Sequence, residues 1–299
     1  MRNERGPMDN HLSTPLDPFF VDGIYYRVIS GANVWVTNQM YPNDYADSCN
    51  SYSGDITIPA TVTHNKIGYA VTAIGANAFR GSTALSSVTL PPTIQLVGSR
   101  AFSDCTNLAS LTLNEGLKSI GALAFENCSK LASLHIPASL SGINASNPIF
   151  AGCSQLDISA EAGGCFSVTD GVLFERGDGD HSGNTRHFIR WIPEKKAGEY
   201  IIPDEVVNIG VHSISGNGLS GINIPANVET IQRNNFRSCE NLTEITLNWK
   251  NPTTVAMSLL TSPFVGMIKS DITLRVPAGT AALYIAHELW GEGFKIVEQ

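Results

Sequence analysis

Residues 119–137 read "SIGALAFENCSKLASLHIP". The stretch contains an isoleucine–glycine pair, a phenylalanine, a cysteine and an alternating apolar segment that ends at a proline. Apolar residues at every second position are typical of a short strand with one buried face. One stretch of this length cannot enclose its own apolar side chains. Its structural meaning therefore depends on whether it recurs in the chain.

The phenylalanine of this stretch recurs every 23 residues, at Phe79, Phe102 and Phe125. Five residues before each phenylalanine an apolar–Gly pair begins, and six residues after it an apolar-x-x-apolar-x-apolar segment begins with leucine. The segment returns after an interruption near residues 159–200. Its apolar triplets are Leu85/Val88/Leu90, Leu108/Leu111/Leu113, Leu131/Leu134/Ile136, Leu219/Ile222/Ile224 and Leu242/Ile245/Leu247.

A repeat of this length predicts a solenoid, because stacked units bury the apolar side chains that one unit leaves exposed. Each unit supplies one short strand, and neighbouring strands form a parallel sheet on one face. The glycine of each apolar–Gly pair marks either a turn with positive φ or a close approach between coils. These glycines are Gly75, Gly98, Gly121 and Gly210.

Four cysteines lie three residues after a phenylalanine of the repeat: Cys105, Cys128, Cys153 and Cys239. Other coils have Ser82 or Asn217 at this position, which indicates a small, weakly polar interior group. We favour packing over a disulfide, because in-register side chains point the same way. Zinc is disfavoured because no CxxC-like spacing occurs. Cys49 and Cys165 lie off the repeat, and their state stays open.

The elements "IGANAFRGSTALSSVTLP", "IGALAFENCSKLASLHIP" and "IQRNNFRSCENLTEITL" resemble the BspA-like leucine-rich-repeat family of bacterial surface proteins. The resemblance covers about residues 54–250. It implies an α/β solenoid of leucine-rich-repeat type, with short parallel strands on one face, irregular or short-helical returns, hairpin insertions and a C-terminal helix cap. It also implies an extracellular or cell-surface location, adhesion to host matrix proteins and co-aggregation.

The departures from the repeat divide the chain into six expected segments. Hairpins are expected within residues 20–37 and 61–72, a projecting hairpin near 166–192, and a helix from Thr280 to about Trp290. The segments are a flexible leader (1–18), an N-terminal hairpin cap (19–53), coils (54–158), an inserted hairpin (159–200), coils (201–250) and a C-terminal cap (251–299).

Composition excludes some classes of function. The net charge is −8 and no run of five basic residues occurs, which argues against nucleic acid. No apolar stretch approaches the ~20 residues of a membrane helix, and residues 1–18 lack the apolar region of a signal peptide. We expect no cofactor, no metal and no catalytic residues, since no nucleophile pairs with a base at a recognisable spacing.

Two groups of residues are candidate binding sites. The first comprises outward positions of the repeated strands, which form a small polar strip. The second is a tripeptide, Arg176-Gly177-Asp178, at an expected hairpin tip, where ordinary turn chemistry is the competing explanation. The strip comprises Ser87, Thr89, Ser110, Thr112, Ser133, His135, Asn223, Glu244 and Thr246.

The expected function is binding of a host or neighbouring-cell protein or glycan by a monomeric, non-catalytic, secreted or surface-anchored protein. Two alternatives remain open at this point. The chain could be an architectural spacer with no ligand of its own, because the strip lacks the Trp, Tyr and Arg anchors of most protein interfaces. It could also be a hydrolase whose dispersed residues leave no motif.

Overall fold

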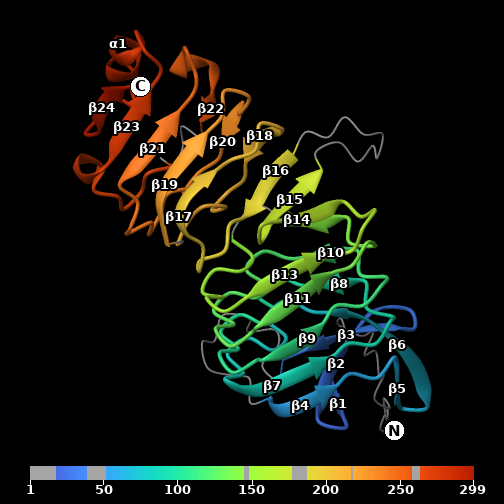
Figure 1. Ribbon diagram of the computed structural model, residues 1–299. Helices are drawn as coiled ribbons and strands as arrows, with labels where there is room; N and C mark the ends of the chain where they lie inside the picture. The colour runs from blue at the N-terminus through green and yellow to red at the C-terminus, as the bar shows by residue number, and fades with distance from the viewer. Residues whose placement is uncertain (1–17, 39–51, 145–147, 177–186, 217, 258–262) are drawn as a thin grey trace, which may run out of the picture.

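A computed structural model describes residues 18–38, 52–144, 148–176, 187–216, 218–257 and 263–299. The chain winds into coils that follow one another from the N-terminus to the C-terminus (Figure 1). Each complete coil contributes a front strand, a turn, a shorter back strand and a second turn. The predicted repeat solenoid is confirmed.

The front strands are the alternating segments of the repeat, and they pair in parallel. In the first half of the chain they form two short sheets, β4-β7-β9 and β11-β13; in the second half they form β17-β19-β21-β23-β24. The bounds are β4 (Ser53–Thr57), β7 (Ala84–Thr89), β9 (Ser110–Thr112), β11 (Ser133–Ile136), β13 (Asp157–Ala160), β17 (Ala197–Ile201), β19 (Gly218–Ile224), β21 (Glu244–Leu247), β23 (Thr273–Val276) and β24 (Lys295–Glu298).

The first back sheet has the order β1-β2-β3-β6-β8-β10-β12, and β5 also pairs with β6. Its coil strands β8, β10 and β12 are only two residues long, and β8 and β10 end at the apolar residue of the apolar–Gly pair. The bounds are β1 (Phe19–Val21), β2 (Ile24–Ser30), β3 (Asn33–Thr37), β5 (Thr61–His64), β6 (Ile67–Ile74), β8 (Leu96–Val97), β10 (Ser119–Ile120) and β12 (Gly142–Ile143). Strands β5 and β6 form the hairpin expected within residues 61–72.

The second back sheet has the order β14-β15-β16-β18-β20-β22. The bounds are β14 (Phe166–Thr169), β15 (Val172–Arg176), β16 (His187–Trp191), β18 (Val206–Ile209), β20 (Thr230–Ile231) and β22 (Ala256–Met257). Strands β14, β15 and β16 were expected to project from the solenoid, but they join this sheet, where β16 runs parallel to β18. The reason is that Val172, Leu173 and Phe174 are all buried, so β15 is covered on both faces.

The described part of the chain contains almost no helix. The returns between strands are turns and two-residue strands, so of the irregular or short-helical returns that we expected, the irregular kind predominates. Helix α1 spans only Ala281–Ile285, shorter than the predicted helix from Thr280 to about Trp290, and the 3-10 turns are η1 (Pro252–Thr254) and η2 (Lys269–Asp271). Cap residues Tyr284 and Trp290 are nevertheless fully buried against the last coils.

The repeated phenylalanines stack in one interior column. Phe79, Phe102 and Phe125 are fully buried, with ring centroids 5.1 and 5.7 Å apart and nearly parallel planes. The column continues through Phe150 to Trp191, at 5.8 and 5.1 Å. A second apolar core begins at Val172 and contains Phe236 and Phe264, stacked at 5.2 Å. The two cores meet at the sheet formed by β14–β16.

The repeated glycines serve close approach between coils. None of the four lies in the left-handed region. A Cβ added to Gly121 would lie 2.3 Å from Ser99 N, and one added to Gly98 would lie 2.6 Å from Ala76 N. Positive φ occurs instead at non-glycine turn residues, among them Asn77, Arg100, Leu123, Asp104 and Asn127.

Truncating the column should be far more costly than changing the sheet surface. We expect Phe125→Ala to lower the free energy of unfolding by about 3–5 kcal/mol, because it leaves a cavity between stacked rings. Thr112→Ala, on the exposed side of β9, should change it by less than about 0.5 kcal/mol. Urea denaturation measures both. Equal losses would contradict the assignment of inward and outward positions.

Close approach at the glycines gives a second prediction. Gly121→Ala should destabilise the fold by about 1–3 kcal/mol, because the backbone of the preceding coil must move away. Gly142→Ala is the matched control, since its φ is not positive and its Cβ would meet nothing within 4 Å. The control should leave stability unchanged or raise it by up to about 1 kcal/mol. Thermal unfolding that ranks the two variants in the opposite order would refute the close-approach account.

Candidate functional site

The predicted strip lies on the outward face of the front strands. In the first half, Ser110, Thr112 and Ser133 are exposed on β9 and β11. Their neighbours on β7 are in register, with Ser87 beside Ser110 and Thr89 beside Thr112. Hydroxyl groups therefore line this part of the sheet with few large side chains between them.

Polar side-chain contacts connect the edges of this strip to neighbouring strands. Ser87 Oγ donates to Asp55 Oδ1 at 2.6 Å on the neighbouring strand β4. His135 Nδ1 lies 2.9 Å from Ser159 Oγ, and its Nε2 lies 3.3 Å from Glu161 Oε2. The structure thus adds Asp55, Ser159 and Glu161 to the predicted residues.

A charged pair lies at the end of the front sheet β11-β13. Lys195 Nζ lies 2.6 Å from Asp157 Oδ1 on β13, so the segment before β17 is bound to the end of the first half. The outward spacing of Asp55/Thr57 and Asp157/Ser159 matches that of Ser87/Thr89. Extending the repeat pattern by one coil in each direction would have found both acids.

The three predicted residues of the second half lie on a separate front sheet. Asn223 Oδ1 accepts from Asn248 Nδ2 at 2.7 Å, and Glu244 Oε2 lies 2.7 Å from Arg275 Nε. Thr246 is only 8% exposed, so it contributes little to a surface. Its register neighbour is the long side chain of Arg275. The structure therefore divides the predicted strip into two patches, one on the sheets β4-β7-β9 and β11-β13 and the other on the sheet β17-β19-β21-β23-β24.

The predicted tripeptide is only partly described. Arg176 ends strand β15 and is half-buried. Gly177 and Asp178 lie outside the described residues. Adhesion through this tripeptide stays a prediction.

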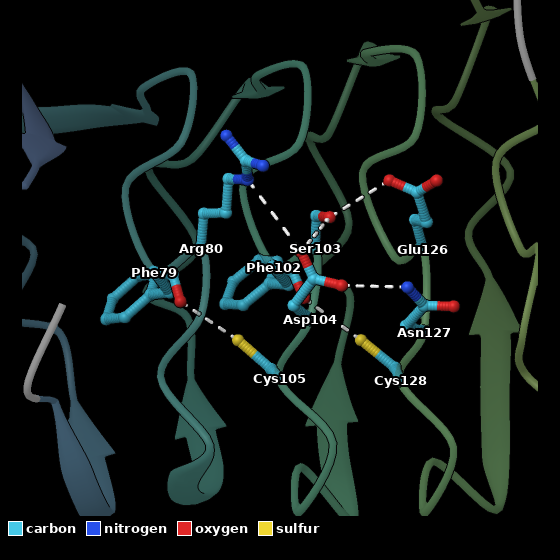
Figure 2. Close-up of polar contacts among 9 residues, drawn as sticks. All are labelled: Phe79, Arg80, Phe102, Ser103, Asp104, Cys105, Glu126, Asn127 and Cys128. Atoms are coloured by element: carbon cyan, nitrogen blue, oxygen red, sulfur yellow. Dashed lines mark hydrogen bonds and ion pairs between the residues drawn. The ribbon is translucent and has the colours of Figure 1, made fainter. Parts of the chain in front are cut away.

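The cysteines form a column beside the phenylalanines (Figure 2). The thiol of Cys105 donates to the carbonyl oxygen of Phe79 at 3.0 Å, and that of Cys128 donates to Phe102 at 3.1 Å. Cys153 repeats the contact with Phe125 at 3.0 Å. Each thiol thus satisfies a buried carbonyl of the preceding coil. Cys105, Cys128, Cys153, Cys165 and Cys239 are free thiols.

Burial suppresses ionisation of these thiols. It raises the pKa of Cys105 to about 12, and it raises the pKa values of Cys128 and Cys153 as well. A thiol that stays protonated is a poor nucleophile and a poor metal ligand. The column is therefore a packing device, as the sequence indicated.

A ladder of polar contacts crosses the turns on the other side of the phenylalanines (Figure 2). Asn127 Nδ2 donates to Asp104 Oδ1 at 2.7 Å, and Arg80 Nε lies 3.7 Å from Asp104 Oδ2. Backbone bonds connect the same turns: the N–H of Asp104 donates to the carbonyl oxygen of Glu126 at 2.8 Å. The N–H of Asn127 likewise donates to Ala151 at 2.6 Å.

Glu194 supplies the hydrogen-bond acceptor of this ladder where the two halves of the chain meet. The N–H of Gly152 has the ladder position, and it donates to Glu194 Oε1 at 2.5 Å instead of to a carbonyl of the next coil. Burial raises the pKa of Glu194, although this bond opposes the shift. The adjoining cavity also contains His212, whose pKa is lowered to about 4 by burial and by Arg237 and Arg233.

The described residues hold no group of three or more His, Cys, Asp or Glu side chains placed to bind a metal ion. Within the same residues, no helix is long and apolar enough to cross a membrane.

The model of the BspA type leucine-rich repeat region matches residues 50–162 and 195–261, in six copies. The matched ranges span more than half of the sequence. The chain belongs to the BspA type leucine-rich repeat family. A search of curated proteins gives no match.

One solved structure supports this fold, and two others are similar to the chain at lower TM-scores. A leucine-rich repeat protein from Eubacterium ventriosum matches with a TM-score of 0.50 and 16% identity over 86% of this chain and 76% of that one. One from Bacteroides capillosus is 27% identical over 48% of this chain and 99% of that one, with a TM-score of 0.40. The pneumococcal vaccine antigen PcpA is 15% identical over 95% and 98%, with a TM-score of 0.41.

The thiol column predicts a labelling pattern. In the native protein iodoacetamide should modify Cys165, which is half-buried, at least about tenfold faster than Cys105, Cys128, Cys153 or Cys239, because thiolate is scarce in the column. Denaturant should remove the difference. Peptide mass spectrometry gives the rate at each site. Rapid native labelling of Cys128, or a lower melting temperature under reductant, would contradict free, packed thiols.

The raised pKa of Glu194 predicts a pH-dependent effect of substitution. A carboxyl whose pKa is raised on folding favours the fold most below its unfolded pKa, and that contribution is lost as pH rises through the folded pKa. Glu194→Gln keeps an acceptor for Gly152 without the charge. It should therefore stabilise the protein at about pH 7 and have little effect at about pH 3.5.

Urea unfolding at the two pH values measures this difference, with the exposed Glu199→Gln as control. A Glu194→Gln variant that is less stable than wild type at neutral pH would show that the charged bond to Gly152 outweighs the cost of burial.

Proposed function

We propose that this chain is a non-catalytic bacterial surface or secreted protein that binds a host or neighbouring-cell protein or glycan. Membership of the BspA type family supports this proposal, because the resemblance implies adhesion at the cell surface. We further propose that the protein acts as a monomer.

The observation that carries the proposal is the first-half strip. Its exposed residues Ser110, Thr112, Ser133 and His135 lie on the front strands β9 and β11, where a ligand would meet small polar donors and acceptors on rigid strands. Sites on regular strands are held more firmly than sites on loops. Polar groups that are already ordered lose little entropy on binding.

The experiment is a screen of the immobilised protein against host extracts and glycan arrays. Ser110→Arg places a bulky charge in the centre of the strip. It should lower the affinity for the captured ligand by about tenfold or more, a loss of at least about 1.4 kcal/mol of binding free energy. Ser154→Arg, exposed on the turn before β13 and not an outward position of a front strand, is the control. Finding no ligand at all would favour the architectural spacer. A ligand that binds Ser110→Arg as well as wild type would remove the strip from the proposal.

A further inference from the structure

The outer face of the first back sheet carries exposed apolar side chains of a kind that the front strip lacks. Phe20 is 55% exposed on β1, Ile29 is 44% exposed on β2 and Leu96 is 37% exposed on β8. Tyr25 and Trp35 are half-buried on the same face. Exposed apolar patches of this kind often mark binding surfaces.

Strand register places these side chains in two short rows on one face of the sheet, offset by two residues along β2, where Tyr25 pairs with Thr37. Phe20 pairs with Tyr25, and Arg27 pairs with Trp35. The residues between them, among them Tyr26 and Val34, point inward and are buried. From Trp35 the register continues through the coil strands. The members there are Ala73, Leu96, Ser119 and Gly142. We call the eight residues from Phe20 to Gly142 the outer row.

Side-chain size does not change evenly along the outer row, because Ala73, which is 4% exposed, lies between Trp35 and Leu96. The row nevertheless ends in small residues that leave a hollow. Aromatic rings occupy β1, β2 and β3, Leu96 follows on β8, and the last two members are Ser119 and Gly142. A cavity opens over this end. Its lining includes Leu96, Gly98, Ser99, Ser119, Gly121 and Gly142. The outer row therefore has two parts: an aromatic platform on β1, β2 and β3, and a shallow groove over β8, β10 and β12.

Trp35 is held in place at the centre of the platform. Its ring atoms lie 3.5 Å from the position that a Cβ on Gly75 would occupy, so the indole packs beside this glycine. The guanidinium of Arg27 lies 5.8 Å from the centre of the indole ring. Trp35 Nε1 has no hydrogen-bond partner within the described part of the chain. The platform therefore presents a half-buried indole whose Nε1 is itself shielded from solvent.

We propose that the outer row binds a neutral, linear glycan laid across the strands. The apolar faces of sugar rings stack on aromatic side chains, and sugar hydroxyl groups bond to small polar groups such as Ser99 and Ser119. Strands about 4.8 Å apart present one outward side chain per step, a spacing similar to the advance of one sugar along an extended chain.

Charge selects this ligand over its competitors. Arg27 is the only charged member of the outer row, and it lies against Trp35. An acidic polysaccharide or an anionic membrane surface needs several cations, which the row lacks. A protein partner needs a deep apolar pocket for an anchor residue, whereas this groove is shallow, and glycine and serine separate its apolar members Leu96, Ile120 and Ile143. The proposal does not depend on the front strip, which lies on different strands.

The tryptophans provide a specific readout. Trp191, Trp249 and Trp290 are 3%, 3% and 0% exposed, so Trp35 is the one that a solute reaches first. Acrylamide quenching of the full chain would be measured with hexasaccharides of β-linked glucose, of β-linked N-acetylglucosamine and of galacturonate. We expect a neutral hexasaccharide to protect Trp35 from quenching and galacturonate to leave it exposed. Trp35→Phe should abolish the quenchable fraction.

Calorimetry on variants locates the site. Gly142→Leu fills the groove without strain, because its φ is not positive and an added Cβ meets nothing within 4 Å. This change should lower the affinity for the neutral hexasaccharide by at least tenfold. Ser110→Arg on the front strip should leave that affinity unchanged.

Three results would overturn the proposal: no neutral hexasaccharide protects Trp35, galacturonate binds as tightly, or Gly142→Leu binds like wild type. If the third result holds and Ser110→Arg abolishes glycan binding, the front strip is supported as the site instead. Failure of the front strip in the ligand screen would leave the outer row untouched.

Discussion

The structure depends on how closely one coil lies against the next. At Gly98 and Gly121 the backbone of the preceding coil occupies the space of a side chain, so only glycine permits the stacking distance. That distance brings the rings of Phe79, Phe102 and Phe125 within 6 Å of one another, and it brings each thiol of the column to the carbonyl of the coil before it. The stacking of the rings, the thiol hydrogen bonds and the polar ladder across the turns therefore all depend on the short distance between coils. A coil supplies half of each contact and its neighbour supplies the other half.

The same dependence explains the region where the repeat stops. Between Phe150 and Ile214 no regular coil supplies the next ring or carbonyl, so other groups take their place. Trp191 stacks on Phe150, and the Glu194 carboxylate accepts the N–H of Gly152. Strand β15 separates two cores by burying Leu173 in one and Phe174 in the other. The irregular segment thus completes the first half of the solenoid and begins the second.

The repeat could be predicted from the sequence because its spacing is set by contacts that recur. The phenylalanine column, the interior cysteines and the outward hydroxyls of β7, β9 and β11 all follow from the 23-residue period. The two-residue back strands could not be predicted, because two residues carry no periodicity. Burial of Thr246 was missed because it depends on the strand beyond, where Arg275 lies. The outer row was missed because its aromatic members belong to β1, β2 and β3, whose register with the coils lies outside the repeat. The separation of the front sheets likewise follows from β14–β16, a segment that no repeat describes.

In this account, each coil is stable only through its contacts with the neighbouring coils of the same core. Hydrogen–deuterium exchange of Phe125→Ala tests it most directly. We expect amide protection to fall in the altered coil and in the coils on both sides of it, near β8 and β12, while β18 to β21 in the second core keep wild-type protection. Loss of protection confined to residues 119–137 would show that each coil is stable on its own and would contradict the account.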